Sequence, residues 1–142
     1  MLLCSRNPSE ESRVVVLVDT SIWVADAARP GFIAQHTVLG EVATCPPVIQ
    51  EVLQGTRSES YIAVRKVLRA AQMIESPMPL EVFEEAADIY RTGRAIGFSI
   101  RSPFDCLIAA VAIRNAIEVL HSDRDFNTIA RFTRLQSRYV AL

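Results

Sequence analysis

The amino-acid sequence predicts an α/β sandwich with a mostly parallel sheet. Three observations carry this prediction. A run of apolar, β-branched residues over 14–18 is typical of a strand buried on both faces. Short apolar stretches alternate along the chain with segments whose apolar residues recur at helical spacing. The 142 residues, 50% of them hydrophobic and 22% charged, are enough to bury one core.

Two strand–helix pairs are predicted in the first part of the chain. A strand over 13–18 leads into the polar residues 19–21, which are suited to start a helix over 22–28. A second strand is expected over 41–45, where a proline pair ends it. Because proline is favoured at the start of a helix, a helix over 48–53 should follow.

The rest of the chain is predicted to alternate in the same way. Leu107–Ile113 is apolar on nearly every side, as in a buried helix. In chain order we expect a helix over 61–71, a strand over 73–75, a helix over 82–90, a helix over 103–115, a strand over 118–121, a short helix over 126–132 and a strand over 135–140. These elements should form a single domain over 13–142, preceded by a flexible, polar leader over 1–12.

Composition and charge exclude several classes of protein. A net charge of −1 argues against coating nucleic acid by bulk electrostatics, although a local basic face is compatible with it. Lys66 is the only lysine, so the sequence contains no phosphate-binding P-loop. No apolar stretch approaches the roughly 20 residues that span a bilayer. The three cysteines form no C-x-x-C pair, which indicates a reducing compartment, and we expect the cytoplasm.

Four carboxylates stand where the predicted elements change. Asp19 follows the first strand, and Asp123 follows the strand over 118–121. Glu51 lies in the first turns of the helix after the proline pair, and Asp105 lies in the first turn of the long buried helix. Ligand sites in open parallel sheets form beyond the carboxyl ends of the strands. Asp19 and Asp123 are expected there, whereas Glu51 and Asp105 need the tertiary fold to bring them.

Each of these acids also has a local explanation. Asp19 would cap the helix that follows it, and Asp105 stands at the capping-box position of its own helix. Glu51 would be a solvated helix residue, and Asp123 and Asp125 would be turn and cap residues. One such coincidence is common. Four in order, each at a junction, favour a shared site.

A shared site of four carboxylates restricts what it can bind. Two carboxylates about 4 Å apart repel each other by roughly 4 kcal/mol at an effective dielectric constant of 20, so the group must take up protons or hold a cation. An all-oxygen set without cysteine or paired histidine suits Mg²⁺, or Mn²⁺, and not structural zinc. Because Mg²⁺ keeps water ligands and bridges to phosphate, we expect metal-assisted phosphodiester hydrolysis.

Four segments of the chain form an ordered set. They are Val-Asp-Thr-Ser-Ile-Trp (18–23), Pro-Val-Ile-Gln-Glu-Val-Leu-Gln-Gly (47–55), Ser-Pro-Phe-Asp-Cys-Leu-Ile-Ala-Ala-Val-Ala (102–112) and His-Ser-Asp-Arg-Asp-Phe (121–126). Together they resemble the PIN-domain ribonucleases, and specifically the VapC toxins of type II toxin–antitoxin modules. The resemblance implies a PIN-like three-layer sandwich with a twisted parallel sheet, and a negatively charged pocket that gathers the acids.

The resemblance also implies a role for each acid. Asp19, Glu51, Asp105 and Asp123 would be the catalytic residues. Asp19 and Asp105 would be direct Mg²⁺ ligands, and Asp123 would complete the metal site. Glu51 would act at the metal directly or through water.

Three further residues are secondary candidates. Asp125 is one, because the Asp-x-Asp pattern leaves open which carboxylate faces the metal. Thr20 and Ser21 would orient Asp19 or contact phosphate. His121 departs from many relatives, which carry a hydroxyl residue at that position, and a packed or hydrogen-bonded histidine is the simpler interpretation.

Arginines in the C-terminal stretch are candidate contacts for an RNA substrate. Arg124, Arg131 and Arg134 have few acids near them in the sequence, although scattered solvated arginines would look the same. The resemblance implies two protein partners as well: a cognate antitoxin that inserts a basic side chain into the acidic pocket, and a second copy of the chain in a homodimer.

The resulting hypothesis is a Mg²⁺-dependent endoribonuclease toxin that cuts structured RNA, such as tRNA or a ribosomal RNA loop. The alternative is a catalytically inactive PIN-like module that binds RNA or a protein. The complete set of acids favours the enzyme, because an inactive module would not need them.

Overall fold

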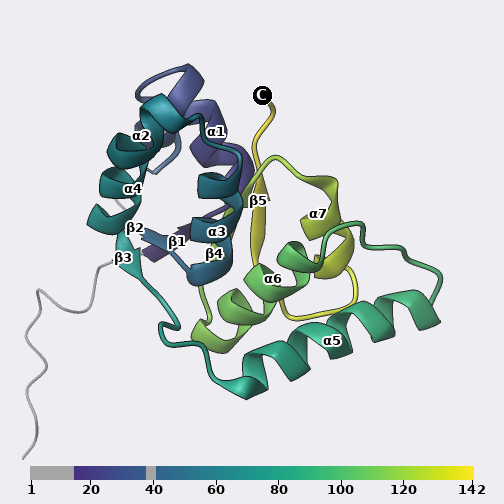
Figure 1. Ribbon diagram of the computed structural model, residues 1–142. Helices are drawn as coiled ribbons and strands as arrows, with labels where there is room; N and C mark the ends of the chain where they lie inside the picture. The colour runs from purple at the N-terminus through teal and green to yellow at the C-terminus, as the bar shows by residue number, and fades with distance from the viewer. Residues whose placement is uncertain (1–14, 38–40) are drawn as a thin grey trace, which may run out of the picture.

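A single parallel sheet forms the centre of the molecule. The computed structural model describes residues 15–37 and 41–142, so the predicted leader over 1–12 lies outside the described residues. The sheet order is β3-β2-β1-β4-β5, and every neighbouring pair is parallel. The strands are β1 (Val15–Val18), β2 (Glu41–Thr44), β3 (Gln72–Met73), β4 (Glu118–His121) and β5 (Ser137–Tyr139). Helices flank this sheet (Figure 1), which confirms the predicted α/β class.

The helices occur close to where the sequence predicts them. They are α1 (Thr20–Ala28), α2 (Phe32–His36), α3 (Pro46–Gln54), α4 (Tyr61–Ala70), α5 (Leu80–Ala95), α6 (Pro103–Asn115) and α7 (Arg124–Ala130), with a 3₁₀ turn, η1, over Ser58–Ser60. Helix α2 was not predicted, because five residues are too few to show a helical period. Within the described ranges, no helix is long and apolar enough to cross a membrane.

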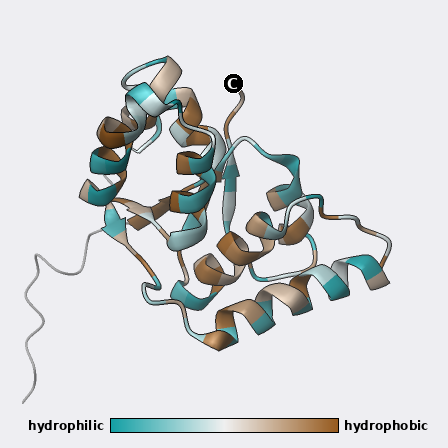
Figure 2. Ribbon diagram, viewed as in Figure 1, coloured by the Kyte–Doolittle hydropathy of each residue, from teal (hydrophilic) through white to brown (hydrophobic). Residues whose placement is uncertain are grey.

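Strand β1 is buried on both faces, as its uninterrupted apolar sequence predicts. Leu17 packs with the larger core cluster, which is formed mainly by α3, α5, α6 and α7. Val16 and Val18 point to the opposite face and pack with α1 and α2. The alternation follows from the two-residue repeat of a strand. Helix α6 is hydrophobic over most of its length (Figure 2), because it is the most deeply buried helix of the larger cluster.

The direction of each helix decides which acids can meet. Helices α1 and α3 begin directly after β1 and β2, and therefore at the carboxyl edge of the sheet. Helix α6 leads into β4, so it must run from the carboxyl edge back to the amino edge. Asp105, in the first turn of α6, is thus carried to the same edge as Asp19.

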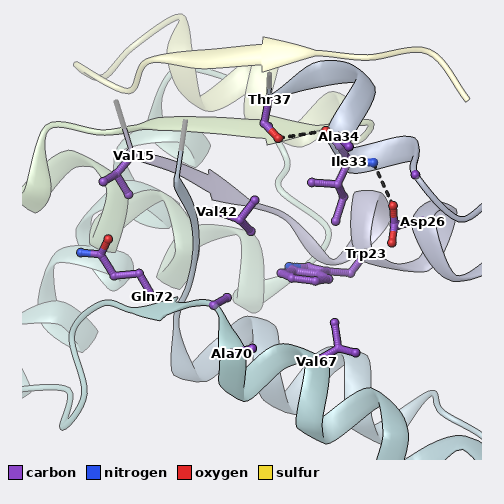
Figure 3. Close-up of a pocket in the computed structure, with 12 residues that line it drawn as sticks. Val15, Trp23, Asp26, Ile33, Ala34, Thr37, Val42, Val67, Ala70 and Gln72 are labelled. Carbon is purple, nitrogen blue, oxygen red and sulfur yellow. Dashed lines mark hydrogen bonds between the residues drawn. The ribbon is translucent and has the colours of Figure 1, made fainter. Parts of the chain in front are cut away.

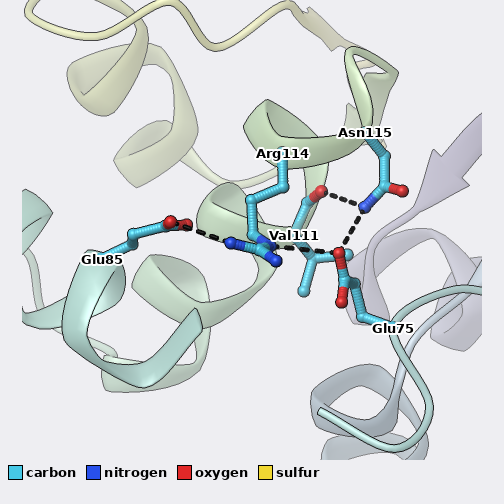
Figure 4. Close-up of polar contacts among 5 residues, drawn as sticks. All are labelled: Glu75, Glu85, Val111, Arg114 and Asn115. Atoms are coloured by element: carbon cyan, nitrogen blue, oxygen red, sulfur yellow. Dashed lines mark hydrogen bonds and ion pairs between the residues drawn. The ribbon is translucent and has the colours of Figure 1, made fainter. Parts of the chain in front are cut away.

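A polar cluster fixes the far end of α6 (Figure 4). Arg114 donates from Nε to Glu75 (3.1 Å) and from Nη1 to Glu85 of α5 (2.9 Å), and Asn115 donates to the same oxygen of Glu75 (3.1 Å). These bonds join α6 to α5 and to the segment after β3. They lie at the opposite end of the helix from Asp105, so they orient α6 from the end that is remote from that residue.

Candidate active site

Asp19 stands at the carboxyl end of β1 and caps α1. Its Oδ2 accepts hydrogen bonds from the backbone N–H of Ser21 (3.1 Å) and from the Ser21 hydroxyl (2.6 Å). Its other carboxylate oxygen, Oδ1, is buried and has no hydrogen-bond partner among the described residues. The capping explanation is therefore correct but incomplete, because the cap uses only one of the two oxygens.

The two hydroxyl residues after Asp19 have different roles. Ser21 holds Asp19 and also accepts from the backbone N–H of Ser122 (3.0 Å), which ties the end of β1 to the end of β4. Thr20 points to another helix, where its hydroxyl donates to Oε1 of Glu51 on α3 (2.6 Å). The prediction had these hydroxyls orient Asp19 or contact phosphate. In the structure Ser21 orients Asp19, whereas Thr20 orients Glu51.

Asp105 is almost completely buried in the first turn of α6, with 2% of its surface exposed. Its Oδ2 has no hydrogen-bond partner in the part of the chain that the structure describes. The Ser102 side chain forms no capping hydrogen bond at the start of this helix. A capping box accordingly does not explain why a carboxylate is buried here.

Asp123 and Asp125 form a pair at the carboxyl end of β4. Asp123 caps α7 and accepts from the backbone N–H of Asp125 (2.9 Å). Asp125 is buried, and its Oδ2 accepts from the backbone N–H of Arg101 (3.0 Å). The carboxylate of Asp125 is therefore engaged with the segment that precedes α6.

These acids form two groups that share Asp105. One oxygen each from Asp19, Glu51 and Asp105 lie within 4.8 Å of one another, and the same holds for Asp105, Asp123 and Asp125. The tertiary fold thus brings together all four predicted catalytic acids and the secondary candidate. We call these five residues the acid cluster.

The acid cluster fits a divalent cation on two grounds. All donors are carboxylate oxygens, which hard cations such as Mg²⁺ and Mn²⁺ prefer. Two of these oxygens, on Asp19 and Asp105, are buried without a hydrogen-bond donor among the described residues, and a buried acceptor without a partner is costly. A cation in contact with both would satisfy them.

Burial raises the affinity of the cluster for protons when no cation is bound. Desolvation is the main cause of a rise in the pKa of Asp19 from 3.8 to about 6. The pKa of Asp105 rises further, to about 9, through desolvation first and then through repulsion from Asp123, Asp19 and Glu51. Protons and a cation therefore compete for the same oxygens.

His121 is a packed residue beneath the cluster. It is fully buried, lies against the rings of Phe126 and Tyr139 (centroids 5.0 and 5.9 Å away), and accepts the backbone N–H of Asp123 at Nδ1 (3.2 Å). Burial lowers its pKa to about 4, so the ring is neutral near pH 7. The simpler interpretation from the sequence agrees with this position, which leaves no surface for a phosphate.

The candidate RNA-contacting arginines lie in three different places. Arg124 is exposed at the start of α7, next to Asp123. Arg131 lies over the ring of Phe98, 4.8 Å from its centre. Arg134 lines a small cavity with Ala112 and Ala116, at the end of α6 that is remote from the acids.

Arg101 is a basic residue near the acids that the sequence analysis did not single out. Its Nε lies 3.8 Å from Oδ2 of Asp125. The only signal for it in the sequence is a basic residue two positions before the proline that opens α6.

Comparison with known proteins identifies the family of the chain. The family model "PIN domain" matches residues 16–132. Ribonuclease VapC11 from Mycobacterium tuberculosis is 34% identical in an alignment of 131 residues that covers 87% of this chain and 97% of the relative. The chain therefore belongs to the PIN-domain family, in which its similar curated relatives are VapC ribonucleases.

Solved structures share the fold. A chain of VapBC-1 from nontypeable Haemophilus influenzae superposes with a TM-score of 0.72 at 16% identity, over 89% of this chain and 98% of that one. A chain of VapBC-5 from M. tuberculosis, a member of the VapBC family of toxin–antitoxin systems, gives a TM-score of 0.65 at 19% identity, over 89% and 99%. At these identities the likeness concerns the fold.

Proposed function

We propose that this protein is a Mg²⁺-dependent endoribonuclease of the VapC toxin kind, which hydrolyses phosphodiester bonds in a structured RNA. Its membership of the PIN-domain family and its VapC ribonuclease relatives support the RNA-cleaving activity. The single structural observation that carries the proposal is the pair of buried carboxylate oxygens, on Asp19 and Asp105, which have no donor among the described residues.

Each acid has a proposed role in this reaction. Asp19, Asp105 and Asp123 hold Mg²⁺, with Mn²⁺ as a substitute, and Ser21 keeps Asp19 oriented through two hydrogen bonds. A bound divalent ion lowers the pKa of a water molecule and neutralises negative charge on the phosphate. Glu51 is oriented by Thr20 and aligns the attacking water.

Removal of the metal tests this function. Purified protein should cleave a tRNA mixture or ribosomal RNA in Mg²⁺, lose that activity in EDTA, and recover it when Mg²⁺ or Mn²⁺ is added back. Cleavage is measured by mapping the new RNA ends. Activity that persists in EDTA would contradict a metal-dependent nuclease, and a protein that binds RNA without cutting it in any metal would instead be the inactive module.

An antitoxin is the first proposed protein partner. A hollow of about 1100 Å³ lies between α1, α2 and α4, and the ring of Trp23 lies inside it between Ile33 and Val67 (Figure 3). Trp23 also lines a second hollow of about 510 Å³, which Glu51 lines as well. The two hollows share Trp23 and Val67, so together they form a partly apolar surface that runs from α2 to Glu51. We propose that an amphipathic antitoxin segment covers it and places a basic side chain among the acids.

A second copy of the chain is the other proposed partner. The groove between α5 and α6 has a volume of about 430 Å³, and its lining is almost entirely apolar. Phe83 and Tyr90 on this face are 49% and 41% exposed, and Leu80 nearby is 70% exposed. A homodimer would remove these side chains from water.

The mass of the protein in solution tests the homodimer. Phe83→Glu should convert a dimer to a monomer in light scattering after gel filtration, because the charge would be buried at the interface. Ile62→Glu on α4 is the matched control, since Ile62 is 81% exposed and lies on another helix. A wild-type monomer, or a dimer that only Ile62→Glu disrupts, would contradict this interface.

The remaining proposals concern the RNA and the location. Arg124, Arg131 and Arg134 are proposed to contact the RNA backbone outside the acid cluster, and Arg124 is the best placed of them because it is exposed beside Asp123. We place the protein in the cytoplasm, where its RNA substrates are made and used. Cys45 and Cys106 are free and buried, which is compatible with a reducing compartment.

A further inference from the structure

Arg101 lies at the rim of the acid cluster, on the segment 96–102 that leads into α6. Its backbone N–H donates to Oδ2 of the buried Asp125 (3.0 Å), and its Nε lies 3.8 Å from the same oxygen. The side chain of Arg101 is 77% exposed, whereas that of Asp125 is 8% exposed. The base of the arginine side chain is thus fixed to a buried acid, while its guanidinium is in solvent.

The segment that carries Arg101 is also anchored at a second point. The ring of Phe98 stacks on Phe132, with centroids 5.9 Å apart, and the guanidinium of Arg131 lies 4.8 Å from the centre of the Phe98 ring. Helix α5 packs closely against Phe132. A Cβ atom at Gly93 would lie 2.8 Å from the Phe132 ring, which shows how closely the helix backbone approaches this ring. Phe98 and Asp125 together hold the segment against α7, so packing sets the position of Arg101.

The guanidinium of Arg101 is available to a ligand. Arg101 forms an ion pair with Asp125, a member of the acid cluster. The other ion pairs among the described residues involve no member of that cluster. At 3.8 Å, and with the arginine so exposed, this ion pair is long and weak. The planar fork of five N–H donors therefore stays largely free, and that fork matches two oxygens of a phosphate.

An RNA substrate needs positive charge at this place. The five carboxylates of the acid cluster repel a phosphodiester, and a cation among them offsets only part of that repulsion. Arg101 stands on the side of the cluster that Asp125 forms, and Asp125 is close to Asp105 and Asp123. Arg101 is thus placed to attract an RNA backbone that approaches the cluster from this side.

We propose that Arg101 forms a phosphate subsite, in which its guanidinium binds nonbridging oxygens of an RNA backbone phosphate beside the acid cluster. Asp125 is then a positioning residue that holds the backbone of Arg101, and this assigns a separate task to each acid of the Asp-x-Asp pattern. The inference rests on the proposed ribonuclease function, and it adds a residue that contacts the substrate to a site otherwise made of acids.

RNA binding at several salt concentrations tests the subsite. The assay uses the Asp105→Asn protein, in which cleavage is expected to be too slow to consume the RNA during the measurement, and follows a labelled single-stranded RNA by fluorescence anisotropy. Adding Arg101→Ala should weaken binding about tenfold and reduce the slope of log Kd against log salt by about 0.7, the value for one phosphate contact on a single strand. Arg101→Lys should keep the slope, because it keeps the charge. The side chain is exposed and the backbone N–H remains, so both variants should fold.

Arg29→Ala is the matched control. Arg29 is an exposed arginine at the end of α1 that is remote from Asp19, so the variant loses the same charge at a distance from the cluster. If Arg101→Ala and Arg29→Ala weaken binding equally, with equal slopes, the subsite is wrong and only bulk charge is involved. In the otherwise wild-type protein, Arg101→Ala should leave the Mn²⁺-induced rise in melting temperature unchanged; a smaller rise would mean that Arg101 acts on the metal site instead.

The outcome for the subsite can be separated from the outcome for the function. Wild-type protein that cuts RNA in Mg²⁺, together with an Arg101→Ala effect no larger than that of Arg29→Ala, overturns the subsite alone. Wild-type protein that cuts no RNA overturns the proposed function, and with it the interpretation of Arg101 as a residue that contacts the substrate.

Discussion

Asp105→Asn should lower Mg²⁺-dependent RNA cleavage by about three orders of magnitude, the scale expected when preorganised charge at a reacting phosphate is lost. Asp105 belongs to both groups of acids, so this one substitution removes a carboxylate from each. Asparagine has the same shape, and the packing of α6 should persist. The rate is measured by single-turnover cleavage of a labelled RNA, and the fold by circular dichroism.

Two further variants make this result interpretable. Asp88→Asn, on the exposed face of α5, changes the charge by the same amount outside the cluster and should cleave at the wild-type rate. Asp19→Asn combined with Asp105→Asn should abolish cleavage. If the pure double variant still cuts RNA at an appreciable rate, the acid cluster is not the active site.

The metal-free protein should lose stability as the pH rises from 6.5 to 9. The pKa of Asp105 is 3.8 before burial and about 9 in the folded protein, so the folded state holds a proton that the unfolded state has released. The free energy of unfolding then falls by about 1.4 kcal/mol for each pH unit in this window. It is measured by urea denaturation with EDTA present. In a second series with saturating Mg²⁺ and no EDTA, the decline should be smaller because the cation replaces the proton.

The middle of this range, about pH 7 to 8, reports mainly on Asp105 among the groups whose pKa is shifted. The pKa of Asp19 is raised only to about 6, so that residue is already mostly ionised there. The lowered pKa of His121, about 4, makes stability rise with pH up to about pH 7 and has little effect above it. The raised pKa values of Cys45 and Cys106, about 12 and 11, lower stability from about pH 8 upward, where the thiols of the unfolded chain begin to ionise.

Asp105→Asn is again the decisive variant for the pH prediction. Without the ionisable group, the decline in stability between about pH 7 and 8 should disappear, and the metal-free variant should be more stable than the wild type at pH 9. A wild-type protein whose stability is constant over this range would show that Asp105 is ionised without a cation, contrary to its burial.

Local sequence was sufficient to predict most of the helices and strands and to single out the candidate acids. The unbroken apolar run of β1, the proline pair at the start of α3 and the apolar residues of α6 each predicted their element, because burial on both faces and helix initiation leave clear local signals. Helix α2 was missed, since it is short and begins after Gly31 in a left-handed conformation (φ 91°), which resembles a turn in sequence.

Contacts between residues that are distant in the chain could not be predicted from the sequence. Thr20 and Ser21 are adjacent, and only the structure shows that one orients Glu51 on α3 while the other orients Asp19. Arg101 and Asp125 are 24 positions apart, so their contact leaves no local pattern. For the same reason the sequence could not separate the tasks of Asp123 and Asp125.

The residue types alone fixed the chemistry, because a set of carboxylates without thiols or paired imidazoles favours a hard divalent ion wherever it is assembled. Whether these carboxylates come together depends on the order of the strands and the direction of the helices. A helix that must return to the amino edge before β4 has to start at the carboxyl edge, and this direction of α6, together with the parallel order of β1 and β4, buried Asp105 against Asp19 and Asp123. Burial, which only tertiary packing creates, raises the affinity of these acids for protons, and protons and cations therefore compete for their oxygens.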